Sequence, residues 1–234
     1  MIVSLYPTKF IFTHVPKCAG KSITNHLFDF LIKKGDNFFH LGCSGDFKNR
    51  IHVPVFKINE ILKKYSLGKH EEYFNFAFVR NPWDRLVSYY FFKKFYQYHK
   101  TTTLEDFINF SLNENIKTIR GFNFIDGVSQ KEMISDILGN VSVNYIGRFE
   151  YLNQDLKEVY NYLKINYHAE LSHINKTEHD NYKNYYNDKL IEKVYLLYKE
   201  EIDFFGFNFE SSAIKNFGFF KKNETENKFK KIGN

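Results

Sequence analysis

The chain has 234 residues, of which 43% are hydrophobic and 19% aromatic, which suffices for one domain with a single core. Its formal net charge of +6 favours an anionic partner, such as a nucleotide, an acidic glycan, nucleic acid or a membrane surface, although a solvated basic surface also fits. The two cysteines have no CxxC spacing, no zinc-ligand pattern is present and no apolar run reaches about eighteen residues, which argues against a disulfide framework, a zinc site and a membrane span. We expect a soluble cytoplasmic protein that does not bind nucleic acid.

Apolar runs bounded by turn residues predict strands at 9–15, 72–80 and 143–149. Helical spacing of apolar residues predicts helices at 22–34, 55–65, 81–99, 104–112, 132–138, 150–164 and 188–204. Asn81 is a good N-cap, Pro82 suits the first helical position, and Asp84 stands where a capping-box acid would. The segments 35–50 and 171–186 are interpreted as loops, and 221–234 as disordered.

Strands that alternate with helices predict an α/β fold with a central, mostly parallel sheet flanked by helices. We expect one domain over residues 1–210, followed by a basic, flexible tail over 211–234. Such folds bind ligands beyond the carboxyl ends of their strands. Two basic loops, one after Val15 and one after Val79, leave from strand ends, so they are expected to face one crevice.

The first of these loops, in "HVPKCAGKSI", has the composition of an anion site. A helix N-terminus carries partial positive charge and exposed N–H groups, where phosphate and sulfate bind readily. Gly20 lets the backbone come close, Lys17 and Lys21 add charge, and Ser22 adds a hydroxyl donor. An ordinary strand–helix turn with exposed lysines is the alternative, and a nucleophilic role for Cys18 is a further one.

The phosphate loop of nucleoside triphosphatases, G-x-x-x-x-G-K-[ST], matches "VPKCAGKS" only in its second half, because Val15 stands at the first glycine. That loop also needs an acid at a later strand end to hold magnesium. The second strand is followed instead by Arg80, and a cation there suits another phosphate and repels a metal ion.

Together, "HVPKCAGKSI" and "FAFVRNPWDRLVSYY" strongly resemble the sulfotransferases that use 3′-phosphoadenosine-5′-phosphosulfate (PAPS). The resemblance is closest to the family of heparan and chondroitin sulfotransferases and their small bacterial relatives. It extends to "NYIGRFEYLNQDL", "LSHINKTEH" and "YKEEIDFFGF", and so covers residues 9–207.

This resemblance implies a P-loop-like, three-layer α/β fold. It also implies that the first loop holds the 5′-phosphosulfate, with Lys17 at the oxygen that bridges phosphate and sulfate. The loop residues assigned to the co-substrate are Lys17, Cys18, Ala19, Gly20, Lys21 and Ser22. Relatives often carry Thr in place of Lys21, which leaves the role of that side chain open.

The second motif implies a 3′-phosphate site made by Arg80 and Ser88. The planar fork of Arg80 suits phosphate oxygens, and Ser88 faces the same crevice only if the chain reverses tightly at Asn81–Pro82. An ion pair between Arg80 and Asp84, and a helix-surface position for Ser88, are the structural alternatives. Later motifs of the family imply further co-substrate contacts from Arg148, Lys176 and Thr177.

Sulfuryl transfer needs in-line positioning, charge stabilisation on the leaving phosphate and a base for the acceptor hydroxyl, and it requires no metal. Lys17 is expected to supply the charge. His52 is the candidate base because relatives carry a histidine just ahead of the helix that precedes the second strand. His14 is the second choice for the base, followed by His40 and His173.

The resulting prediction is a sulfotransferase that moves a sulfuryl group from PAPS to a hydroxyl acceptor, expected to be a carbohydrate. A P-loop nucleotide kinase and a non-catalytic nucleotide- or polyanion-binding relative are the alternatives. A magnesium requirement would favour the kinase, and nucleotide binding without sulfuryl transfer would favour the binding module.

Overall fold

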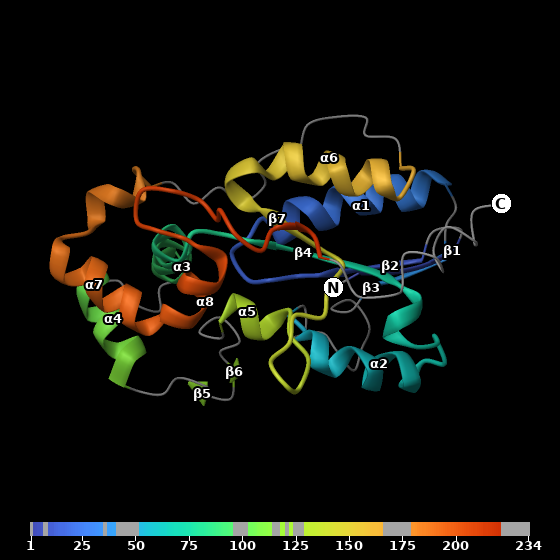
Figure 1. Cartoon of the computed structure of the whole chain (residues 1–234), viewed down its shortest axis with the longest axis horizontal. Coiled ribbons are helices and arrows are strands. Elements are labelled where there is room, and N and C mark those ends of the chain that lie inside the picture. The colour runs from blue at the N-terminus through green and yellow to red at the C-terminus, as the bar shows by residue number, and fades with distance from the viewer. Residues whose placement is uncertain are drawn as a thin grey trace.

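The fold is a mixed α/β arrangement around one twisted sheet (Figure 1). The computed structural model describes residues 2–6, 9–34, 37–40, 52–95, 103–113, 118–119, 122–123, 129–165 and 179–220. The sheet has six strands in the order β3 (Asn37–His40), β1 (Ile2–Tyr6), β2 (Phe10–Thr13), β4 (Phe74–Val79), β7 (Tyr145–Arg148) and β8 (Gly218–Phe219).

The centre of the sheet is parallel and its margins are antiparallel. β2 pairs with β4, and β4 with β7, in parallel, whereas β1 and β8 are antiparallel to β2 and β7. Thr13 lies opposite Ala77, and Val79 opposite Arg148. The carboxyl ends of β2, β4 and β7 therefore meet at one edge of the sheet, where an α/β fold places its ligand.

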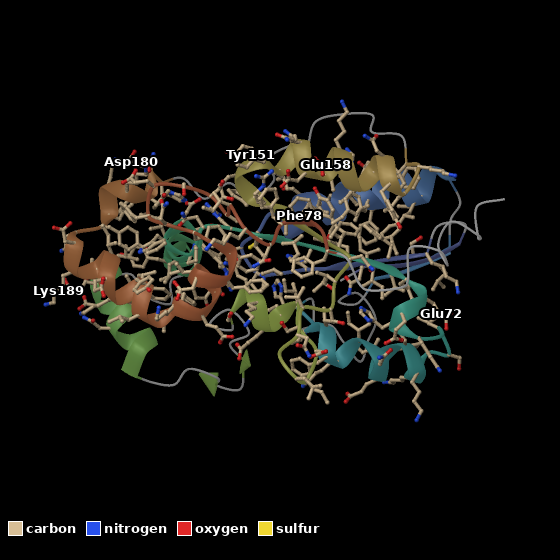
Figure 2. The ribbon with its side chains drawn as sticks, in the orientation of Figure 1. Glu72, Phe78, Tyr151, Glu158, Asp180 and Lys189 are labelled. Carbon is tan, nitrogen blue, oxygen red and sulfur yellow. The ribbon has the colours of Figure 1, made fainter. Side chains whose placement is uncertain are left out.

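The central strands are apolar because both faces of the sheet are covered. Every residue of β2 and of β4 is buried. Phe12 and Phe76 stack with their ring centroids 5.2 Å apart, and Phe78 lies in the middle of the core (Figure 2). This continuous burial is why the two strands were predictable from the sequence.

Helices cover both faces of the sheet, which makes three layers. Figure 1 shows α1 (Gly20–Lys34) and α6 (Leu152–Tyr162) on one face, and α2 (Ile58–Lys64) and α5 (Gln130–Met133) on the other. Short 3-10 helices occupy 55–57, 70–72, 149–151 and 182–185.

A second group of helices lies beyond the carboxyl edge of the sheet (Figure 1). It consists of α3 (Pro82–Phe95), α4 (Leu104–Asn113), α7 (Asp188–Leu197) and α8 (Lys199–Phe205). A two-residue ribbon of β5 (Thr118–Ile119) and β6 (Phe122–Asn123) follows α4. Trp83 joins α3 to α7 within this group, because its buried indole N–H donates to the Ile191 carbonyl at 3.1 Å.

The three predicted central strands are confirmed. The edge strands of the sheet and the ends of two helices differ from the prediction. β1 was not predicted, and β3 lies in a segment interpreted as loop. The helix predicted at 132–138 is α5 at Gln130–Met133, followed by a turn closed by a Ser135–Val141 bridge. The helix predicted at 188–204 is interrupted at Tyr198, where α7 ends and α8 begins.

The folded part also continues past the predicted boundary at residue 210. Ala213 is buried, and β8 pairs with β7 through Phe219 and Tyr145. The remainder of the predicted tail, 221–234, lies outside the described residues. None of the helices in the described part of the chain combines the length and apolarity needed to cross a bilayer.

Candidate active site

The loop between β2 and α1 contains two residues with a positive backbone φ. Lys17 and Ala19 have φ of 64° and 59°, in the left-handed region. Residues other than glycine adopt this conformation at a cost, and they cluster at ligand sites. Alternation of left- and right-handed residues turns successive N–H groups toward a shared centre, which suits an anion. α1 begins at Gly20, and Ile23 N donates to Ala19 O at 3.0 Å, so the first turn of the helix, with its exposed positive end, lies at this loop.

Gly20 opens α1 because a side chain there would strike His14. An added Cβ would lie 1.8 Å from both Cδ2 and Nε2 of the His14 ring. His14 is buried at 8% exposure, so its ring cannot swing into solvent without loss of packing. The glycine therefore gives a histidine room beside the first turn of α1, in addition to leaving the backbone accessible.

Replacing Gly20 with alanine should lower the free energy of unfolding by about 1–3 kcal/mol, the usual cost of overpacking. The variant His14→Ala removes the obstructing ring, so in the double variant the penalty of the alanine should largely disappear. Urea unfolding of the four proteins in this cycle measures the coupling. Strictly additive losses would show that the ring and the glycine do not constrain each other.

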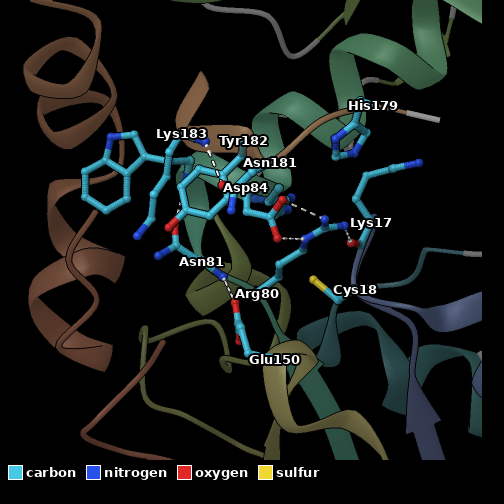
Figure 3. Close-up of polar contacts among 12 residues, drawn as sticks. Lys17, Cys18, Arg80, Asn81, Asp84, Glu150, His179, Asn181, Tyr182 and Lys183 are labelled. Atoms are coloured by element: carbon cyan, nitrogen blue, oxygen red, sulfur yellow. Dashed lines mark hydrogen bonds and ion pairs between the residues drawn. The ribbon is translucent and has the colours of Figure 1, made fainter. Parts of the chain in front are cut away.

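The second loop is joined directly to the first by Arg80 (Figure 3). Its Nη1 donates to the Lys17 carbonyl at 3.1 Å, and the guanidinium lies 3.9 Å from the centroid of the Phe149 ring. Nε and Nη2 donate to the two carboxylate oxygens of Asp84, each at 2.8 Å. The ion pair that the sequence left open is thus present. Of the five N–H donors of a guanidinium, these three bonds leave two.

β4 passes into α3 within two residues of Arg80. Asn81 Oδ1 accepts from Trp83 N at 3.1 Å and caps α3, while Asn81 N donates to Glu150 Oε1 at 2.7 Å. Glu150 follows β7, and its carboxylate thus ties the start of α3 to the end of that strand. Arg80 and the first turn of α3 therefore lie together at the carboxyl edge of the sheet.

Ser88 lies on the face of α3 that contacts the first loop. Arg85, three residues earlier, donates from Nε to the Pro16 carbonyl at 3.1 Å. Phe92, four residues later, has the Lys17 ammonium 4.2 Å from its ring centroid. Residues at these spacings share one side of a helix, so Ser88, which is buried, stands between two contacts to the first loop.

Cys18 is a structural member of the first loop. Its thiol is 1% exposed and donates to Gln130 Oε1 at 3.2 Å. Burial in apolar surroundings raises its pKa to about 12, only partly offset by Arg85 and Arg80. At neutral pH the thiol stays protonated, which opposes the nucleophilic alternative. Contact of Cys18 with a ligand would have to come from its backbone.

Arg148 follows the third parallel strand, but its guanidinium is engaged by Asp155. Nε and Nη2 donate to the carboxylate at 2.9 Å each, and Tyr151 and Phe217 stack on the guanidinium at 4.2 and 3.9 Å. A contact from Arg148 to a co-substrate stays a prediction. Lys176, Thr177 and His173 lie outside the described residues, and His40 is the last residue of β3.

His52 lies against the first loop through His14. Its Nδ1 is 3.0 Å from the His14 carbonyl, and the two rings meet edge to face at 4.4 Å. Because a carbonyl only accepts, Nδ1 carries the proton in this contact, so Nε2 of a neutral ring is the acceptor. This is the tautomer that a general base needs. Its role as the base stays a prediction.

Three residues near the loops were missed by the sequence reasoning. His179 lies on the Lys17 side of Arg80 in Figure 3, with its ring stacked on Phe91 at 5.3 Å. Gln130 and Glu201 are buried beneath both loops. A capping box from Ser129 to Glu132 was a readable signal for the start of α5, and it would have placed Gln130 at the first helical position.

Comparison with known proteins assigns the chain to a class. The family model described as "Sulfotransferase family" matches residues 6–208, so the chain belongs to this family and is a sulfuryl transferase. The match covers both loops and the strands that precede them. Searches among curated proteins and among solved structures found no significant match.

Proposed function

We propose that the chain transfers the sulfuryl group of PAPS to a hydroxyl of a carbohydrate acceptor, on a P-loop-like scaffold. The hydrogen bond from Arg80 Nη1 to the Lys17 carbonyl carries this proposal. It places two cationic turns, which leave adjacent parallel strands, side by side at the carboxyl edge of the sheet. A doubly phosphorylated adenosine needs such a pair, one turn for each phosphate.

In this proposal the first loop binds the 5′ end through backbone N–H groups of the loop and of Gly20, Lys21 and Ser22. Lys17 stabilises the negative charge that develops on the leaving phosphate as the bond between sulfur and the bridging oxygen breaks. Arg80 and Ser88 hold the 3′-phosphate. His52 accepts the proton of the acceptor hydroxyl at Nε2 while the acceptor oxygen forms its bond to sulfur.

The choice of a carbohydrate rests on the resemblance of the two loop motifs to heparan and chondroitin sulfotransferases. The expected donor rests on the pairing of Arg80 with the first loop. Arg148, Lys176 and Thr177 are proposed as additional contacts to the nucleotide, with the ion pair between Arg148 and Asp155 orienting the first of them.

Calorimetric titration with adenosine 3′,5′-bisphosphate, set against ADP with Mg²⁺, tests the proposal. Binding of the bisphosphate in preference to ADP·Mg²⁺ is expected. Preference for ADP·Mg²⁺ would favour the P-loop kinase instead. Bisphosphate binding without transfer of sulfur-35 from PAPS to any member of a saccharide panel would favour a non-catalytic relative.

Replacing His52 with alanine should lower kcat by about 10²–10⁴-fold, the usual contribution of a general base. Bisphosphate affinity should stay near the wild-type value, since the proposed base acts on the acceptor hydroxyl and its Nδ1 bonds the His14 carbonyl. His26→Ala is the matched control, because His26 pairs with Tyr160 on the α6 side of α1. A fully active His52→Ala beside an inactive His179→Ala would move the base to His179.

A further inference from the structure

The buried side-chain amide of one residue links the first loop, after β2, to the second loop, after β4. Gln130 is completely buried at the start of α5. Its Oε1 accepts from Arg80 N at 2.8 Å and from the Cys18 thiol at 3.2 Å. Its Nε2 donates to the Arg80 carbonyl at 2.8 Å. A single side chain therefore holds both backbone groups of Arg80 and the first loop at once.

Glu201 orients this amide. The residue is 1% exposed on α8, and its carboxylate accepts from Gln130 N at 2.5 Å and from Gln130 Nε2 at 2.9 Å. Because a carboxylate accepts hydrogen bonds, the amide nitrogen must face Glu201 and the amide oxygen must face Arg80 N and Cys18. The protonated thiol of Cys18 fits this orientation as a donor.

The network bridges segments that are distant in sequence and adjacent in the proposed site. Residues 18, 80, 130 and 201 come from the loop after β2, the loop after β4, α5 and α8. Buried polar groups are costly unless they are fully paired, and a paired network fixes one arrangement of its neighbours. The arrangement held here is the separation of the two loops.

We propose that Gln130 and Glu201 are positioning residues that hold the two loops at the spacing of the 5′- and 3′-phosphates of one adenosine. This inference rests on the proposed function. A ligand gripped by both loops gains from the second contact only while their spacing matches its own, because that contact is effectively intramolecular. A ligand with one phosphate uses one loop and does not depend on the spacing.

The variant Gln130→Met tests this role, since methionine has similar length and no hydrogen-bonding amide. Calorimetry would compare adenosine 3′,5′-bisphosphate with adenosine 5′-monophosphate and adenosine 3′-monophosphate. The bisphosphate Kd should rise about tenfold or more, while each monophosphate Kd changes less than about threefold. The advantage of the bisphosphate over either monophosphate thus falls.

Tyr160→Phe is the matched control, because it removes a buried hydroxyl that bonds His26 Nδ1 at 2.7 Å, away from the loops. It should lower Tm without a change in the bisphosphate advantage. If Gln130→Met does not fold, Glu201→Gln replaces it: this isosteric change loses one of the two acceptor oxygens and should reduce the same advantage, by a smaller factor.

An unchanged bisphosphate advantage in a folded Gln130→Met or Glu201→Gln protein would overturn the positioning role. Equal weakening of all three ligands would do so too, since it is the signature of general destabilisation. Failure of the wild-type chain to bind the bisphosphate would instead reject the proposed function itself. The two failures are therefore distinguishable.

Discussion

Replacing Lys17 with alanine should lower kcat by about 10²–10³-fold, the scale of losing one donor to a developing anion. The ammonium of Lys17 lies beside Phe92, on the face of α3 that also carries Ser88. In the proposed reaction the charge on the leaving phosphate grows as the bond to sulfur breaks, so a cation there stabilises the transition state more than the ground state. Bisphosphate affinity should fall much less than kcat.

Alanine at position 17 removes the ammonium group without a large change in the backbone strain of the loop. Lys17 has a positive φ, and any residue with a Cβ bears a similar backbone cost there, whereas glycine would relieve it. Lys63→Ala on α2 is the matched control for loss of one positive charge, because Lys63 is exposed and lies in the last turn of that helix. Rates and affinities from a PAPS-dependent sulfur-35 assay and calorimetry decide the outcome. Equal losses in kcat and in bisphosphate affinity would make Lys17 a binding residue only.

The centre of the fold was predictable because its signal is local. β2, β4 and β7 are short apolar runs with a turn at each end, and the helices between them have a clear apolar face. β1, with the sequence IVSLY before Pro7, is a comparable apolar run that the prediction missed, whereas β3, with the sequence NFFH, has only two apolar residues. They extend the sheet through antiparallel pairs such as Val3 with Ile11 and Val3 with Phe39, and such pairing depends on neighbours that a window of sequence does not contain.

The candidate site was predictable in its loops and not in their support. Strand–turn–helix order and the residue types around Lys17 and Arg80 sufficed to place both turns at one edge of the sheet. Gln130, which bonds the backbone of Arg80, lies 50 positions later in the chain. Glu201, which orients Gln130, lies 71 positions after Gln130. A lone buried glutamine has no sequence pattern of its own, because its role is defined by groups that only the fold brings near it.

Asp84 is a residue whose predicted role is filled by another side chain. Its position suggested a capping acid for α3, and Asn81 provides that cap. The carboxylate instead forms a two-point ion pair with Arg80, four residues earlier. This pair fixes the plane of the guanidinium before any ligand arrives. A pre-oriented cation loses less side-chain entropy on binding a phosphate, which favours affinity.

Replacing Arg80 with alanine should weaken binding of adenosine 3′,5′-bisphosphate by about 2 kcal/mol or more, or roughly 30-fold. Two N–H donors of the guanidinium remain after its bonds to Asp84 and the Lys17 carbonyl. Charge-assisted bonds from these donors to the 3′-phosphate would be lost in the variant. Adenosine 5′-monophosphate, which lacks that phosphate, should bind nearly as well as it does to the wild-type chain.

The comparison of ligands separates a lost contact from a damaged fold. Alanine at position 80 also leaves the Asp84 carboxylate without its ion pair, so thermal unfolding must accompany the titrations. Arg80→Lys keeps the charge and loses the fork, and it should recover only part of the affinity. Arg80→Ala should also lose affinity for adenosine 3′-monophosphate. Gln130→Met, by contrast, should retain its affinity for both monophosphates. Unchanged bisphosphate affinity in Arg80→Ala would remove Arg80 from the site, and with it the shared grip of the two loops.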